Sequence, residues 1–221
     1  MKAFCRGQKL KRLTLDAKKR KCRSLLPGPM GHLSCIVVCL VFLAATLFLG
    51  CSGPMHYVHP TADLTYITTV AIVPFENLTQ ERGAEGKMRN VVAADVLRRG
   101  VFDVVEFGEV AKILKEEGFR QEEGTISKRI AERAGKRLNV QAFIVGSVEE
   151  YGVSRTAGSS YPEVSLSLKL IDAKSYKILW EATHNIKGAT MLDRLFGVGK
   201  KSPSDLSKEL VSEMFDTLFG S

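Results

Sequence analysis

The sequence predicts an α/β fold: a single domain with a mixed β-sheet covered by helices, preceded by a leader for export. Three observations lead to this fold class. An apolar run at 70–75 closes on a proline, several segments repeat apolar residues at helical spacing, and two consecutive segments between 164 and 186 alternate apolar and polar residues. In chain order the predicted elements are β-α-β-α-α-β-β-β-α, which combines one βα unit with an antiparallel meander.

The basic character of the chain is confined to its beginning. Residues 1–30 hold ten of the 32 Lys and Arg and a single acid, Asp16, and residues 33–50 form an uncharged, apolar run. Basic residues followed by such a run are typical of a secretory signal whose basic side stays in the cytoplasm. From Cys51 onward, 22 basic residues face 23 acidic ones, so the mature chain is near neutral. This balance argues against a broad nucleic-acid-binding surface, and no nucleic-acid partner is expected.

The apolar run ends in Leu47-Phe48-Leu49-Gly50-Cys51, which resembles the lipobox of bacterial lipoproteins. The resemblance implies cleavage between Gly50 and Cys51, a diacylglycerol on the Cys51 sulfur and an acyl chain on the new N-terminus. The alternative is an uncleaved transmembrane anchor in which Cys51 is an ordinary apolar residue. The basic segment is long for a signal, so translation from Met1 and translation from Met30 both remain open.

Three regions are therefore expected. Residues 1–50 are a signal peptide, residues 51–68 are the lipidated cysteine and a flexible tether, and residues 69–219 are the α/β domain. The tether contains Pro54 and Pro60 and shows no periodicity. Ser52 follows the cysteine where an aspartate would favour inner-membrane retention, so we expect an outer-membrane lipoprotein facing the periplasm.

The first half of the domain contains two strands and three helices. The run 70–75 predicts a buried strand, and apolar residues on one face predict a helix over 87–99 that Gly100 ends. A second strand is expected over 101–107, followed by helices over 109–117 and 126–138.

The second half contains three strands and a final helix. Residues 142–148 predict a buried strand, and the alternation in 164–171 and 177–186 predicts a hairpin with a turn at 172–176. We expect Ser204 to cap the last helix, whose core face carries Leu206, Leu210, Met214 and Leu218.

The sequence contains no convincing catalytic, metal or cofactor site, so we expect no enzyme. His56 and His59 have no ligand set around them, and His184, within a strand, is expected to be structural. The segment 197–202 lacks the first glycine and the hydroxyl residue of a phosphate loop. Glu149 and Glu150 are adjacent in a strand, so alternation predicts that they point to opposite faces and cannot form an acid/base pair.

With these residues in view, the chain resembles the CsgG family of bacterial lipoproteins. The matching segments are Val-Ala-Ile-Val-Pro-Phe-Glu-Asn-Leu-Thr at 70–79, Phe-Ile-Val-Gly-Ser-Val at 143–148, and Leu-Ile-Asp-Ala-Lys at 170–174 with Ile-Leu-Trp at 178–180. The resemblance implies a periplasmic α/β domain, which in that family forms a ring, and it says little about activity. The two segments where the family carries barrel hairpins, 149–163 and 188–202, are short and polar here, which predicts a domain without its own pore.

The leading functional hypothesis is a non-enzymatic outer-membrane lipoprotein that assists an envelope secretion or assembly system such as curli assembly. One alternative is an LpoB-like regulator of peptidoglycan synthesis, and another is a subunit of an oligomeric secretion channel. The expected partners are the membrane, through the lipid anchor, and an unidentified envelope protein, and a homo-oligomer is left open. The loops 153–161 and 196–202 are the candidate contact segments.

Overall fold

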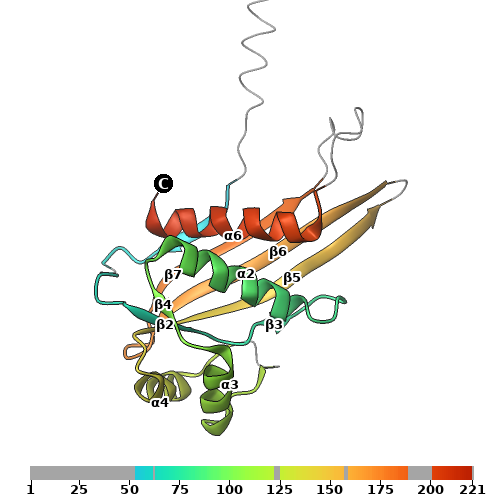
Figure 1. The fold of residues 1–221 in the computed structure, drawn as a ribbon. Coiled ribbons are helices and arrows are strands. Elements are labelled where there is room, and N and C mark those ends of the chain that lie inside the picture. The colour runs from blue at the N-terminus through green and yellow to red at the C-terminus, as the bar shows by residue number, and fades with distance from the viewer. Residues whose placement is uncertain (1–52, 62, 122–124, 157–158, 189–200, 221) are drawn as a thin grey trace, which may run out of the picture. The chain divides into compact units, whose positions relative to one another are not determined.

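The computed structural model describes residues 53–61, 63–121, 125–156, 159–188 and 201–220, and they form the mixed α/β domain that the sequence predicts (Figure 1). The strands are β1 (Met55–Val58), β2 (Thr69–Ile72), β3 (Glu76–Asn77), β4 (Asp103–Val104), β5 (Ala142–Thr156), β6 (Ser159–Asp172) and β7 (Ile178–Lys187). The helices are α2 (Ala84–Arg99), α3 (Phe107–Glu116), α4 (Lys128–Leu138) and α6 (Pro203–Phe219).

All seven strands belong to one sheet with the order β1-β7-β6-β5-β2-β4, and β3 also pairs with β5. Strand β2 runs parallel to β4 and β5, whereas β5, β6 and β7 form the antiparallel meander predicted from their alternation. The strand at 101–107 is shorter than expected, because only Asp103 and Val104 pair with β2.

Helices cover both faces of the sheet, and each face has its own core. Helices α2 and α6 lie side by side on one face, and α3 and α4 cover the other face at β2 and β5 (Figure 1). The first core contains the inward residues of β6 and β7, among them Leu168 and Trp180, packed against Phe215 of α6. The second contains Phe143 of β5 together with Leu114 and Ala134.

Local signals in the sequence fix the ends of the two helices on the first face. Gly100 ends α2, as the sequence predicts. It adopts the left-handed conformation (φ 65°), and its backbone N–H donates hydrogen bonds to carbonyl oxygens of the last turn. Helix α6 begins two residues earlier than expected. Its cap is Ser202 and not Ser204, because Ser202 and Asp205 form a reciprocal capping box with Pro203 in the first turn.

The expectation of an unstructured tether over 51–68 is wrong for residues 55–58. These residues form β1, which pairs antiparallel with β7 from Met55 opposite Thr183 to Val58 opposite Trp180. Further along, Ile67 is buried in the first core. The sequence concealed β1 because all four of its side chains are exposed, which leaves no alternation to detect.

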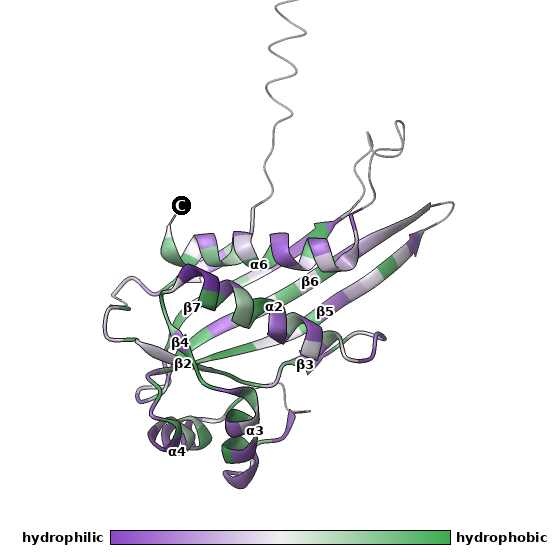
Figure 2. Cartoon of the chain, viewed as in Figure 1, coloured by the Kyte–Doolittle hydropathy of each residue, from purple (hydrophilic) through white to green (hydrophobic). Residues whose placement is uncertain are grey.

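The expected contact loop at 153–161 is mostly strand. Strands β5 and β6 continue as a paired hairpin to Thr156 opposite Ser159, and the hairpin extends beyond the helices (Figure 1). Its outer end is largely hydrophilic (Figure 2). Gly152 has a φ of 137° within this stretch, and Pro162 of the returning strand lies opposite Val153. Pairing between neighbouring strands therefore extends the hairpin where side-chain patterning predicted a loop.

Acid is expected to destabilise the domain partly through Asp172, which accepts hydrogen bonds from Tyr66 Oη (2.6 Å) and the backbone N–H of Ser175 (2.5 Å). Burial alone would raise the pKa of Asp172, but these bonds lower it below its ordinary value. The stabilisation is thus complete above the ordinary aspartate pKa and is lost as pH falls through the lowered one. In Tyr66→Phe, the free energy of unfolding should fall less steeply below about pH 4 in urea titrations. Tyr57→Phe, which changes a tyrosine that does not contact Asp172, is the control and should give the same pH dependence as the parent. If Tyr66→Phe also gives the parent's slope, the bond from Tyr66 does not lower the pKa of Asp172.

Candidate functional site: the groove between α2 and α6

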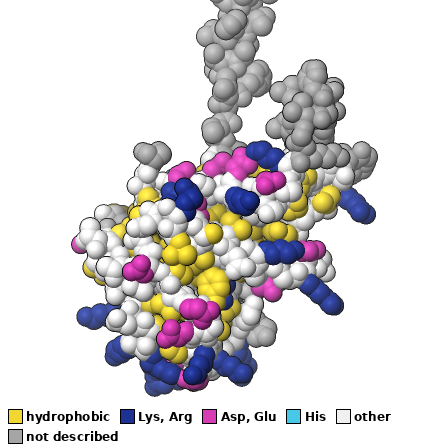
Figure 3. Space-filling view, in the orientation of Figure 1, with side chains coloured by type: hydrophobic (Ala, Val, Ile, Leu, Met, Phe, Trp, Pro, Cys, Tyr) yellow, Lys and Arg dark blue, Asp and Glu magenta, His cyan; other side chains and the backbone are white. Residues whose placement is uncertain are grey.

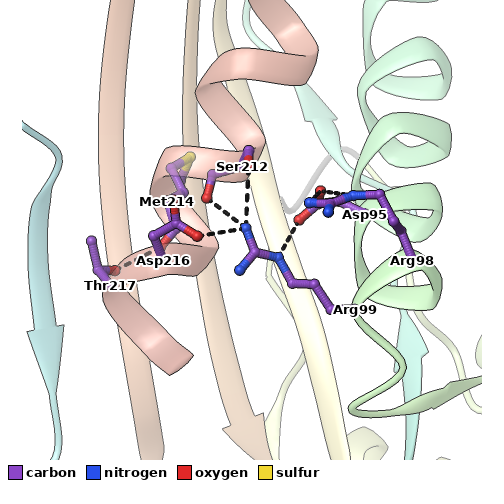
Figure 4. Close-up of polar contacts among 7 residues, drawn as sticks. All are labelled: Asp95, Arg98, Arg99, Ser212, Met214, Asp216 and Thr217. Atoms are coloured by element: carbon purple, nitrogen blue, oxygen red, sulfur yellow. Dashed lines mark hydrogen bonds and ion pairs between the residues drawn. The ribbon is translucent and has the colours of Figure 1, made fainter. Parts of the chain in front are cut away.

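Arg99, near the end of α2, joins the two helices of the first face. Its Nε donates to Asp95 Oδ2 at 2.7 Å, and its Nη2 donates to Asp216 Oδ1 at 2.8 Å and to the carbonyl oxygen of Ser212 at 2.9 Å (Figure 4). Residues 95 and 99 are one helical turn apart, so both reach toward α6. These bonds fix the separation of the helices near the C-terminal end of α2.

Each charged group in this network is paired with a group of opposite charge. Burial alone would lower the pKa of Arg99, but Asp95 and Asp216 raise it above its ordinary value, so the guanidinium stays charged. The Asp95 side chain is only 9% exposed, and its second oxygen accepts from Arg98 at 2.5 Å. Each buried charge therefore has an opposite charge beside it, which is the condition for keeping ionised groups at a helix interface.

Beside this network the two helices leave a groove with a volume of about 630 Å³. One face of α2 and one face of α6 line it: Asn90, Val91, Ala94, Asp95, Arg98, Lys208, Glu209 and Ser212. Apolar side chains lie between basic and acidic ones on this face of the molecule (Figure 3). Val91 and Ala94 contribute apolar surface, and Arg98, Lys208 and Glu209 contribute charge around it.

An apolar centre with a charged rim suits contact with another protein more than it suits chemistry. The groove is open, its titratable groups are already paired or facing water, and it contains no histidine, cysteine or tyrosine. In the described part of the chain, no three His, Cys, Asp or Glu residues come together as a metal-binding group.

The residues singled out in the sequence lie elsewhere. His184 is buried in β7, with Nε2 2.7 Å from Glu213 Oε2 of α6, so it links the sheet to the helix, as its expected structural role requires. Gly50 and Cys51, the leader with Met1 and Met30, and residues 196–200 lie outside the described residues. No helix among the described segments is sufficiently long and apolar to span a bilayer.

The argument that Glu149 and Glu150 point to opposite faces is wrong in its premise. A β-bulge in β5 between Val148 and Glu150 breaks the alternation there. Glu149 accepts hydrogen bonds from Ser167 Oγ (2.6 Å) and Ser165 Oγ (3.0 Å), and Glu150 lies opposite Ser165 in the register. Glu149 thus bonds across to β6, on the face that α2 and α6 do not cover.

Sequence reasoning missed the groove. Its lining residues come from two helices more than 100 residues apart, so no local motif contains them. A partial signal was available: Asn90, Val91, Ala94 and Arg98 recur at helical spacing along one side of α2, next to its core face. Only the packing of α6 beside α2 shows that this face adjoins a groove.

Comparison with solved structures supports the fold. The PelC dodecamer from Paraburkholderia phytofirmans is similar, with 17% identity over 75% of this chain and 95% of that chain and a TM-score of 0.51. The lipoprotein GNA1162 from Neisseria meningitidis is similar at 22% identity, over 70% of this chain and 99% of that one, with a TM-score of 0.52. At these identities the likeness extends to the fold alone. A search of curated proteins finds no match.

The family is shown by a family model, described as peptidoglycan-synthase activator LpoB, that matches residues 56–186. The match begins in β1 and ends in β7, so it covers the whole sheet. It overturns the expected CsgG membership, and the associated curli and secretion functions have no support. The segments quoted for that resemblance are strands and turns of the core, which related folds share. The alternative function, an envelope regulator, is the one supported. The chain belongs to the LpoB family of peptidoglycan-synthase activators.

Proposed function

We propose that this protein is a non-enzymatic lipoprotein of the cell envelope that activates a peptidoglycan synthase by binding to it. The observation that carries the proposal is the match of residues 56–186 to the LpoB family model, whose description names that activity. The α2–α6 groove supports a role in binding, because its surface combines an apolar centre with a charged rim.

The proposed anchor is a lipid on Cys51, with the protein facing the periplasm from the outer membrane. The lipobox-like segment ending at Gly50-Cys51 and the presence of Ser52 after it support this placement. Three residues separate Cys51 from Met55, the first residue of β1. At roughly 3.6 Å per residue, four steps extend at most about 14 Å, so the synthase must approach the domain at the membrane.

The groove is the proposed contact surface, and Ala94 offers a direct test because its side chain is exposed there. Ala94→Arg places a long charged side chain in the groove without entering the core. We expect it to weaken binding of the organism's peptidoglycan synthase by at least about tenfold, which corresponds to about 1.4 kcal/mol. Isothermal titration with the purified synthase measures the change.

Ala111→Arg is the matched control, since Ala111 is an exposed alanine of α3, on the other face of the sheet. It should bind like the parent. Equal affinities for parent, Ala94→Arg and Ala111→Arg would remove the groove from the proposal. No binding by the parent chain to any synthase of the organism would remove the function itself.

A second proposal concerns assembly. PelC, whose fold this chain shares at 17% identity, is a dodecamer. If this chain also forms a ring, the native mass of the detergent-extracted protein will be many times that of one chain, whereas an activator that acts as single copies will give the mass of one.

A further inference from the structure

We propose that the β1 edge of the sheet lies on the membrane surface and forms an apolar contact with the lipid, in addition to the covalent anchor. Strand β1 is an edge strand that pairs with β7 alone. Met55, Tyr57 and Val58 are 81%, 47% and 40% exposed. Three large apolar side chains within four residues are an unusual surface for an edge strand that faces only water.

The position of β1 in the chain decides what covers these side chains. This step rests on the membrane anchor proposed above. The anchor is either a lipid on Cys51 or an uncleaved apolar segment that ends at residue 50, and in both cases Met55 follows within five residues. The interfacial region of one leaflet is roughly 5–7 Å thick, and the spacer extends at most about 14 Å. Strand β1 therefore stays within reach of the headgroups at all times.

The composition of β1 fits an interface. Tyrosine, with an apolar ring and a polar hydroxyl, favours the boundary between headgroups and acyl chains. Met55 and Tyr57 alternate with His56, so they project from the same face of the strand, opposite Thr183 and Glu181 of β7. Strand β1, Met55–Val58, contains no Asp, Glu, Lys or Arg, whose burial in lipid would be unfavourable.

The chain offers a clean experiment because it contains no cysteine after Cys51, whose sulfur is blocked when lipidated. An environment-sensitive fluorophore is attached to His56→Cys in the full, processed protein. The protein is reconstituted in phosphatidylethanolamine–phosphatidylglycerol vesicles that contain nitroxide-labelled phospholipid. The comparison position is Ala111→Cys, which is exposed on α3, the helix that packs at β2 near the opposite edge of the sheet.

We expect nitroxide quenching at position 56 to exceed that at position 111 by at least about threefold, because one label touches the interface and the other does not. Adding Met55→Ser and Tyr57→Ser should reduce quenching at 56 toward the level at 111. Adding Leu97→Ser, which removes from α2 an apolar side chain that is 57% exposed, should leave quenching at position 56 unchanged.

Equal quenching at 56 and 111 would overturn the proposal, and so would strong quenching that survives the double serine variant. Energy transfer between labels at position 56 of two copies, without lipid quenching, would assign the edge to a second copy instead. Intact mass reports separately whether Cys51 carries acyl chains, and titration with the synthase reports separately whether the proposed function holds.

Discussion

Replacing Trp180 by alanine is expected to lower the free energy of unfolding by about 3–5 kcal/mol, the largest effect of any single change considered. Trp180 is fully buried in β7 and stacks on Phe215 of α6, with ring centroids 5.5 Å apart and an interplanar angle of 15°. Its Nε1–H donates to Thr217 Oγ1 at 2.9 Å. The alanine variant loses the ring contacts and leaves a cavity between the sheet and α6.

Urea unfolding followed by circular dichroism measures this change, and Trp180→Phe separates its causes. Phenylalanine keeps most of the stacking on Phe215 but loses the bond to Thr217, so we expect a cost of about 1–2 kcal/mol. A loss below about 1 kcal/mol for Trp180→Ala would show that α6 does not pack on the sheet as described.

Replacing Arg99 by alanine is expected to lower the free energy of unfolding by about 2 kcal/mol. The change removes the bond to Asp95 and the three bonds to α6, one to Asp216 and two to Ser212, while Asp95 remains nearly buried. Because Arg99 fixes the separation of α2 and α6, the variant should also bind the synthase more weakly. Urea unfolding and isothermal titration measure the two effects on the same preparation.

Arg98→Ala is the matched control for the effect of Arg99→Ala on the free energy of unfolding; because Arg98 itself lines the groove, it is not a control for binding. Arg98 bonds the same aspartate from the same helix, but its side chain is 64% exposed, compared with 14% for Arg99. Exposed ion pairs contribute little, so we expect a change within about 0.5 kcal/mol. If the two alanine variants lose equal stability, the links from Arg99 to α6 do not stabilise the fold.

Most of the fold follows from the sequence because the elements that build the core carry their pattern within one segment. Strands β6 and β7 alternate apolar and polar residues, and α4 repeats apolar residues every four positions, as the structure confirms. Gly100 ends α2 where expected. These patterns depend only on which side of a segment is buried, and the residues of that segment alone are enough to identify the buried side.

The elements that the sequence did not predict owe their structure to their neighbours. Strand β1 and the outer end of the β5–β6 hairpin are held by backbone pairing, and their side chains record no buried face. The cap at Ser202 was readable, since Ser-Pro-Ser-Asp at 202–205 combines a capping serine, a proline and an acid at the third helical position. The groove depends on two helices meeting, which no single segment encodes.

The family resemblance failed for a related reason. The segments 70–79, 143–148, 170–174 and 178–180 lie largely in the core strands and the β6–β7 turn, where burial restricts the choice of residues in any sheet of this kind. Such residues report the fold and carry little information about partners. The residues that carry the CsgG resemblance include none that line the groove, such as Ala94 and Arg98.

We propose that this chain activates a peptidoglycan synthase by direct contact. The most direct measurement titrates the processed, lipidated protein into a purified synthase of the same organism and follows the rate of glycan-strand polymerisation. We expect a rate that rises and saturates near one protein per synthase, with Ala94→Arg shifting the curve to higher concentration and Ala111→Arg following the parent. A rate that does not change at any ratio, for every synthase of the organism, would contradict it.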